Sequence, residues 1–351
     1  MSRTLEKFSI KVDFPVYCAG FTPSGEVLLG GGGGPGNTGV NNKLVLFKCK
    51  LSEKTLEQVV EVILNKEEDR PTCIAIHNED NIFACGINST AEKINHGSNN
   101  NCRIFEYSNE NTNEDDYQKV AAFTQDGKLL ATGGTDSKLA VLKYPSLDVA
   151  FPPVNFSKQE IYDLDFDSTG NQVVRIDCKM FLLSSFGCFR EILENSFNKK
   201  WACRFGKGTS AGFFYTVVNM TSISRTFLVK WNATTFERCS TKVIGKRRIT
   251  TFTISDNGKL LGYGASDHSI GICDSLTLKV LLIVPNVHGF PPTTIAFNHD
   301  STLVVSGSAD NSVHIIQLPE TFNTGGLQLI IILIVTLIVL YYIFYQTLSN
   351  F

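Results

Sequence analysis

Short alternations of apolar and polar residues recur along most of the chain, each next to a turn rich in Gly, Asp, Asn or Ser. Such alternation is typical of strands that bury one face. The clearest copies read FTQDGKLLATGGTDSKLAVL, ISDNGKLLGYGASDHSIGIC and FNHDSTLVVSGSADNSVHII. The copies begin at residues 21, 76, 123, 166, 205, 254 and 297, and are therefore spaced by roughly 40 to 55 residues. This period, with strand–turn–strand content, is typical of a β-propeller.

The pattern predicts an all-β fold, a seven-bladed WD-repeat-like β-propeller with four strands in each blade, over residues 1–320. Closing the ring removes the long exposed strand edges that would otherwise aggregate. The first predicted strand, Phe8 to Val12, precedes the first copy. We expect it to complete the last blade and so fasten the ring.

One segment departs from this pattern. Residues 327–345 read LQLIIILIVTLIVLYYIFY and carry no charge. As a helix they would be about 28 Å long, close to the hydrocarbon thickness of a bilayer. The alternative is a buried core helix, but a soluble helix of this length normally shows a polar stripe. The sequence thus predicts one C-terminal transmembrane helix, with a linker at 321–326 and a short lumenal tail at 346–351.

The N-terminus has no apolar stretch that could act as a signal peptide, so we expect the large domain to stay in the cytosol. The ten cysteines are scattered and never form a CxxC pair. This pattern favours reduced, buried thiols over a zinc site or a disulfide framework. Four Asn-x-Ser/Thr sequons, which we expect to be unmodified, begin at Asn88, Asn155, Asn219 and Asn232.

Composition narrows the classes of function further. The chain has 351 residues, of which 43% are hydrophobic and 19% charged, which excludes a disordered protein. The net charge of −2 supplies no basic field for nucleic acid. The short basic run Lys246–Arg248 is interpreted as a solvated turn. A DNA-binding regulator is therefore disfavoured, and no nucleic-acid partner is expected.

Three aspartates occupy the same place in different repeats: Asp136 in GTDSK, Asp267 in ASDHS and Asp310 in SADNS. Catalytic carboxylates would not be distributed one per repeat, whereas turn-forming aspartates would. We assign all three to structural turns, together with His268 and His299. The histidines show no close pairing with a Ser or Cys that would indicate nucleophilic catalysis.

The glycine-rich run Gly30–Lys43, GGGGGPGNTGVNNK, lengthens the hairpin of the first repeat. It contains a GxGxxG match, but the strand-like KLVLFKCK follows it where a dinucleotide site needs a helix. The loop is therefore not expected to bind a nucleotide. Ordered glycines can turn their carbonyls toward a cation or let the backbone approach a partner closely. From composition alone, a spacer and a functional loop remain equally open.

The chain resembles the ER-anchored exchange factors for the Sar small GTPase, called PREB proteins in animals. The resemblance rests on YCAGFTPSGEVLLGGGGGPGNTGVNNKLVLFK, on the RPT of Arg70–Thr72, on HIIQLP at His314–Pro319 and on the single C-terminal apolar segment. The chain departs from that family in an extra glycine, in Pro35, in lacking WD dipeptides and in its short tail.

The resemblance implies a guanine-nucleotide exchange factor, without covalent chemistry, that releases GDP from a Sar-type small GTPase at the ER membrane and so initiates COPII coat assembly. It implies that the loop at residues 30–43 of the first blade contacts the GTPase and holds a potassium ion. The implied contact residues are Asn42, Val40, Gly39 and Asn37. The implied potassium ligands are the carbonyls of Gly32, Gly33, Gly34 and Asn41. The alternative is a membrane-tethered propeller scaffold that recruits trafficking proteins without exchange activity.

Overall fold

The computed structural model divides the chain into two compact units, Met1–Leu318 and Pro319–Phe351. The residues that it describes are 5–36, 38–96, 102–106, 120–133, 138–155, 161–176, 180–184, 189–191, 200–322 and 335–340.

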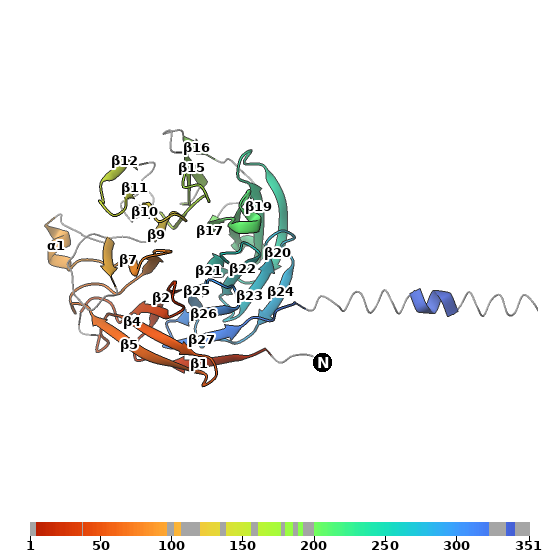
Figure 1. Cartoon of the computed structure of the whole chain (residues 1–351), viewed down its shortest axis with the longest axis horizontal. Helices are drawn as coiled ribbons and strands as arrows, with labels where there is room; N and C mark the ends of the chain where they lie inside the picture. The colour runs from red at the N-terminus through yellow and green to blue at the C-terminus, as the bar shows by residue number, and fades with distance from the viewer. Residues whose placement is uncertain are drawn as a thin grey trace, which may run out of the picture. The chain divides into compact units, whose positions relative to one another are not determined.

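The first unit is an all-β propeller (Figure 1). Seven antiparallel sheets follow one another in sequence order. The first strand of each sheet contacts the first strand of the next, in the order β2, β6, β9, β13, β17, β21 and β25, and β25 contacts β2 again. These contacts close the ring.

The first four sheets of the ring run from β2 to β16. The first two contain β2 (Val16–Phe21), β3 (Val27–Gly31), β4 (Lys43–Lys50) and β5 (Thr55–Ile63), then β6 (Cys73–Ile76), β7 (Ile82–Gly86) and β8 (Cys102–Glu106). The next two contain β9 (Val120–Phe123), β10 (Leu129–Gly133), β11 (Lys138–Lys143) and β12 (Val149–Asn155), then β13 (Asp163–Phe166), β14 (Gln172–Ile176), β15 (Met180–Ser184) and β16 (Phe189–Glu191).

The fifth sheet contains β17 (Lys200–Phe205), β18 (Phe213–Met220), β19 (Arg225–Asn232) and β20 (Arg238–Gly245). The sixth contains β21 (Ile249–Ile254), β22 (Leu260–Ala265), β23 (Ile270–Asp274) and β24 (Val280–Val284). The last contains β25 (Pro292–Phe297), β26 (Leu303–Ser308) and β27 (Ser312–Gln317), together with β1 (Lys7–Lys11). Short helices are α1 (Ala91–Asn95), η1 (Gly208–Ser210) and η2 (Thr221–Ile223).

The number of complete blades differs from the prediction of seven. Six sheets have four strands, and the sheet of β6, β7 and β8 has three. Residues 107–119, which follow β8, lie outside the described residues. The described chain therefore contains six complete four-stranded blades and one three-stranded sheet.

The predicted role of the first strand is confirmed. β1 pairs antiparallel with β27, which places Phe8 opposite Ile315 and Ile10 opposite Val313. The order β1-β27-β26-β25 makes β1 the outer strand of the last blade. Phe8 and Ile10 also pack against the hydrophobic cluster that joins the last blade to the first. The N-terminus therefore fastens the ring where the repeats end.

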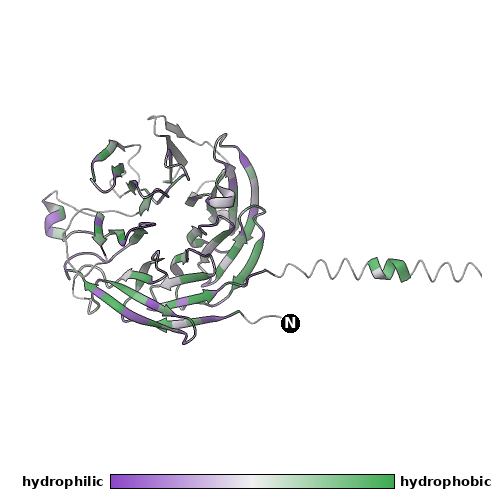
Figure 2. Ribbon diagram, in the orientation of Figure 1, coloured by the Kyte–Doolittle hydropathy of each residue, from purple (hydrophilic) through white to green (hydrophobic). Residues whose placement is uncertain are grey.

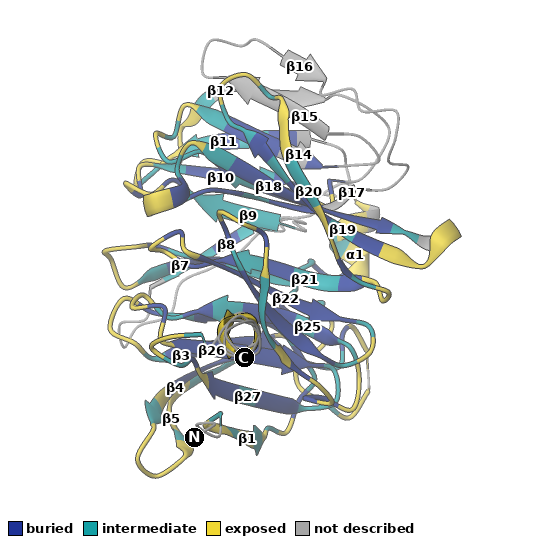
Figure 3. Ribbon diagram, turned by 90° about the vertical axis from the view of Figure 1, so that its right-hand side faces the viewer, coloured by how far each residue is buried: buried dark blue, intermediate teal, exposed yellow. Residues whose placement is uncertain are grey.

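The core lies between neighbouring sheets, as the period-two pattern requires. Leu29 packs with Val305 in the cluster between the first and last blades, whereas its neighbour Leu28 packs with Phe83 of the next sheet. Figure 2 shows apolar residues running along the strands, and Figure 3 shows inner strands such as β26 and β27 as largely buried and the hairpin loops as exposed.

The cysteines in the described residues are free thiols, and Cys178 and Cys188 lie outside those residues. Burial raises the pKa of Cys102 and of Cys273 to about 12. These two thiols are therefore uncharged at neutral pH.

The second unit contains the predicted span at 327–345, of which the structure describes residues 335–340 as helical. Among the described residues, the structure contains no helix with the length and apolar character needed to cross a membrane.

Deleting residues 1–12 removes the outer strand of the last blade and exposes the core that Phe8 and Ile10 cover. We expect the melting temperature to fall by several degrees or more, because a few kcal/mol of apolar burial and strand pairing are lost. Differential scanning calorimetry measures this. The matched control is Ser9→Ala, because Ser9 lies on the exposed face of the same strand. A deletion as stable as this control would contradict the closure.

Candidate functional site

The glycine-rich loop occupies residues 32–42, between β3 and β4 of the first blade. Backbone hydrogen bonds attach it to two other segments. Gly32 N donates to Pro15 O at 3.0 Å, just before β2, and Gly36 N donates to Lys66 O at 3.1 Å. Lys66 lies in the 64–72 connection, the segment that joins β5 to β6. The loop is therefore held at its base and along one side.

Asn42 is the main polar anchor of the loop. Its side-chain Oδ1 accepts a hydrogen bond from Gly34 N at 2.9 Å, and its Nδ2 donates to Gly34 O at 3.1 Å. Nδ2 also donates to Glu68 O at 2.8 Å, in the 64–72 connection. Asn42 is only 1% exposed. One buried amide thus joins the start of the loop, its end and the segment behind it; we call this group the Asn42 clamp.

This geometry bears on the predicted contact role of Asn42. The amide is turned into the loop, where a direct contact with another protein would first require these three hydrogen bonds to break. In the described conformation, the Asn42 side chain is engaged by Gly34 and Glu68.

A buried ion pair between Glu68 and Arg103 lies next to the Asn42 clamp. Glu68 Oε2 accepts a hydrogen bond from Arg103 Nη1 at 3.0 Å, and Glu68 Oε1 lies 2.9 Å from Arg103 Nη2. The two side chains are 3% and 7% exposed. Because Glu68 carries this pair on its side chain and the Asn42 bond on its carbonyl, β8 is linked to the loop through one residue. Breaking one side of such a pair is strongly destabilising.

The RPT tripeptide lies against the same loop. The Arg70 guanidinium stacks over the Tyr17 ring at 4.2 Å and contacts Asp69 at 3.5 Å. A Cβ added at Gly34 would approach Arg70 Nη1 at 2.9 Å, and one added at Gly30 would approach Pro71. The two most distinctive motifs of the sequence are therefore packed together.

At two positions of the loop, neighbouring atoms lie so close that only glycine fits. A side chain at Gly32 would collide with the Asn42 amide, and Gly32 has a φ of +143°. A side chain at Gly33 would collide with Thr38. Glycine alone fits such positions without strain. The glycines therefore let the loop fold back on itself around Asn42.

The loop presents Gly39 and Asn41 to solvent, with Pro35, Gly36 and Thr38, whereas Val40 is half-buried and packs toward the core shared with the last blade. Asn37 lies outside the described residues. A pocket of about 130 Å³ opens between the loop and the 64–72 connection. Its lining is Gly36, Gly39, Val40, Asn41, Asn42 and Lys66.

The predicted potassium ligands are uncharged backbone oxygens, which is the donor type that replaces the hydration shell of potassium. The described residues contain no group of His, Cys, Asp or Glu that could hold a metal. The carbonyl of Gly34 already accepts a hydrogen bond from Asn42. The loop therefore offers the right donor type, with one predicted ligand engaged by the clamp.

Two of the three repeated aspartates have the contacts of turn residues. Asp267 Oδ1 accepts from Ser269 N at 3.3 Å, and Asp310 Oδ1 accepts from Ser312 N at 2.9 Å. Asp136 lies outside the described residues. His268, with a φ of +68°, sits in one of these turns, whereas His299 contacts Asp256 at 3.3 Å.

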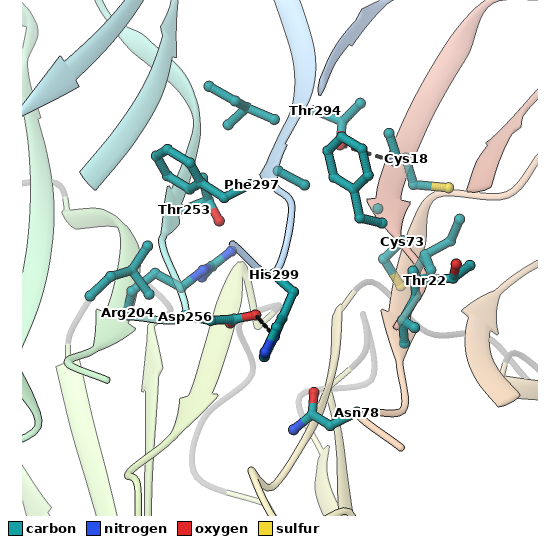
Figure 4. Close-up of a pocket in the computed structure, with 18 of the residues that line it drawn as sticks. Cys18, Thr22, Cys73, Asn78, Arg204, Thr253, Asp256, Thr294, Phe297 and His299 are labelled. Carbon is teal, nitrogen blue, oxygen red and sulfur yellow. Dashed lines mark hydrogen bonds and ion pairs between the residues drawn. The ribbon is translucent and has the colours of Figure 1, made fainter. Parts of the chain in front are cut away.

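A second candidate is the central channel, a cavity of about 850 Å³ (Figure 4). Two ion pairs involve residues that line it: Lys207 Nζ contacts Asp256 at 2.8 Å, and Arg204 pairs with Asp163 at 2.6 Å. Figure 4 shows His299 pointing toward Asp256. Burial raises the pKa of Asp165 beside the channel to about 6. The carboxylate-bearing Glu79 also lines this cavity.

Sequence reasoning missed Glu68 and Arg103. No local motif marks them, because their pairing depends on how β8 and the 64–72 connection meet in the folded ring. The sequence signal that comes nearest is the RPT motif, which begins two residues after Glu68.

The fold and its repeats define the class of protein as a WD-repeat propeller. The family model described as "WD domain, G-beta repeat" matches residues 280–317, which span β24 to β27.

The chain is similar to proteins named SEC12 or SEC12-like, two of which are exchange factors by name. The chain is 26% identical over 89% of its length to "Guanine nucleotide-exchange factor SEC12" of Candida glabrata, of which it covers 72%. It is 29% identical over 51% of its length to the protein of that name in Mus musculus, of which it covers 47%. It is 23% identical over 84% of its length to "SEC12-like protein 2" of Arabidopsis thaliana, of which it covers 76%. These names confirm the resemblance predicted from the sequence.

Arg103→Leu would leave the Glu68 carboxylate buried without its partner. We expect the free energy of unfolding in urea to fall by about 3 kcal/mol or more, because an uncompensated buried charge is costly. We also expect faster amide hydrogen exchange at residues 33–42. The matched control is Lys50→Leu, which breaks an exposed pair with Glu57 and should change little. Equal effects of both variants would contradict the supporting role of the buried pair.

Proposed function

We propose that this chain is a guanine-nucleotide exchange factor that releases GDP from a Sar-type small GTPase at the ER membrane and so initiates COPII coat assembly. The observation that carries the proposal is the clamped glycine-rich loop on a propeller whose relatives are named as exchange factors. The reaction needs no covalent chemistry from this chain.

Such a loop accelerates exchange by binding the nucleotide-free GTPase more tightly than the GDP-bound GTPase. A small GTPase holds GDP through its phosphate loop and Mg²⁺, with the switch segments over the site. A partner that binds the nucleotide-free state more tightly must weaken nucleotide binding by the same factor. The stretch of the loop from Thr38 to Asn41, which is exposed except for the half-buried Val40, would enter the GTPase and hold its switch segments open.

The clamp matters because an ordered loop loses less conformational entropy on docking. A stretch with this many glycines would otherwise sample many backbone states. Asn42 fixes both ends of the loop and attaches them to the 64–72 connection. We assign Asn42 to positioning and the exposed Gly39 and Asn41, with Asn37 and Val40, to the contact.

The domain assignment belongs to the same proposal. The closed order of first strands supports counting the β6–β8 sheet as an incomplete blade of a seven-bladed ring at residues 1–320. The uncharged sequence at 327–345 supports a single-pass membrane anchor, with a linker at 321–326 and a lumenal tail at 346–351. The propeller would then be cytosolic.

Asn42→Ala removes all three side-chain bonds of the clamp. We expect the rate of GDP release from a Sar-type GTPase, followed with a fluorescent GDP analogue, to fall about tenfold or more. The melting temperature should fall, because the Gly34 and Glu68 backbone groups lose buried partners, so GDP release is measured at a temperature at which the variant is still fully folded. The same assay separates exchange from scaffolding, since a scaffold would bind the GTPase without accelerating release.

The matched control is Asn298→Ala. Asn298 also makes three side-chain hydrogen bonds, to Thr302 and Leu303, but in a turn at the opposite end of the strands from the glycine-rich loop. The Asn298→Ala variant should accelerate GDP release from the GTPase as the wild type does. Wild-type release by Asn42→Ala would overturn the role of the loop.

We also propose that potassium binds the loop through its carbonyl oxygens and stiffens it. Replacing potassium by lithium at constant ionic strength should then slow GDP release and speed amide hydrogen exchange at residues 33–42. The exchange readout is independent of the GTPase. Identical hydrogen exchange in the two salts would contradict a potassium site.

A further inference from the structure

Four cationic side chains gather on loops that the exchange proposal does not use. Arg225 begins β19, and Lys246, Arg247 and Arg248 connect β20 to β21. All four are exposed. None of them has an acidic ion-pair partner in the part of the chain that the structure describes. We call these residues the basic cluster.

The backbone of the basic cluster is fixed from inside the propeller. The buried Thr226 hydroxyl lies 2.7 Å from Arg247 O, and Ser266 N donates to Arg248 O at 2.8 Å. The buried Asn219 amide makes two bonds with the backbone of Ile249, both of 2.9 Å. With these carbonyls occupied on the inside, little backbone freedom is lost when a ligand docks.

The cluster surrounds a concave site. A pocket of about 210 Å³ is lined by all four cations together with Asn219, Met220, Ser224, Thr226 and Ser266. Asp267, which follows the lining residue Ser266, has its Oδ1 engaged by the amide and hydroxyl of Ser269. The pocket therefore combines positive charge with hydroxyl groups, and no carboxylate of a described residue lines it.

We propose that the basic cluster is a binding site for a ligand that carries clustered phosphate groups, such as an inositol polyphosphate headgroup, free in solution or on a membrane lipid. Guanidinium groups bind phosphate oxygens bidentately, and serine hydroxyls add further donors. A flat acidic protein surface would not need the pocket. This site is independent of the glycine-rich loop and of the exchange activity.

The test is isothermal titration of inositol hexakisphosphate into the full chain in neutral detergent micelles. The triple variant Arg225→Gln, Arg247→Gln, Arg248→Gln should bind about tenfold more weakly or worse, because charge-assisted bonds are lost. Wild-type affinity should also fall as salt rises. The matched control replaces the exposed Lys242, Lys259 and Lys279 by Gln, which removes the same charge away from the pocket and should leave binding unchanged.

A second arm identifies the source of the phosphate. Amide hydrogen exchange at residues 246–248 is compared in phosphatidylcholine nanodiscs with and without phosphatidylinositol 4-phosphate, and with free inositol hexakisphosphate. Protection by the lipid indicates a membrane ligand, and protection by the free compound alone indicates a soluble one; both support the site.

Three results would overturn the proposal. The first is a wild type that does not bind inositol hexakisphosphate, and the second is a correctly melting triple variant that binds it equally well. The third is a triple variant that loses only the binding of an acidic protein, because the cluster would then be a protein-docking surface.

Discussion

The loop geometry depends on one buried amide. Asn42 closes the glycine-rich loop onto Gly34 and fastens it to the carbonyl of Glu68. Without those bonds, two peptide groups of a glycine-rich segment and one of the 64–72 connection would lose buried partners, which costs about 1–3 kcal/mol per group. The clamp thus turns a sequence with high backbone entropy into a surface of defined shape.

The propeller makes this arrangement possible. The loop, the 64–72 connection and β8 belong to two neighbouring sheets, and they meet because β2 and β6, the first strands of these sheets, contact each other in the ring. The buried pair between Glu68 and Arg103 joins the second sheet to the clamp. At the other side of the first blade, β1 and the last blade share its core. Ring closure at residues 7–11 and loop order at 32–42 are therefore parts of one packed unit.

Much of the fold could be predicted from the sequence, because its determinants are local. The repeated turns and the alternation of apolar residues indicated the all-β propeller, and the position of the first strand before the first repeat indicated its pairing with β27. The weak copy that begins at residue 76 also marked the hairpin of β6 and β7. The sequence pattern does not reveal, however, which residues complete that blade.

The site was only partly predictable for a similar reason. The glycines and asparagines marked the loop, but the direction of the Asn42 side chain depends on a carbonyl 26 residues away. Arg103 depends on a strand from the next sheet, and no spacing in the sequence connects it to the loop. The basic run Lys246–Arg248 has the sequence of an ordinary turn, and only the fold of β18 and β19 brings Arg225 and a hydroxyl-lined pocket beside it.

The most direct test of the central claim is a structure of this chain bound to a nucleotide-free Sar-type GTPase. The account predicts that residues 38–41 lie between the switch segments while the bonds from Asn42 to Gly34 and Glu68 remain intact. A complex in which this loop points into solvent, with the GTPase bound elsewhere on the propeller, would contradict it.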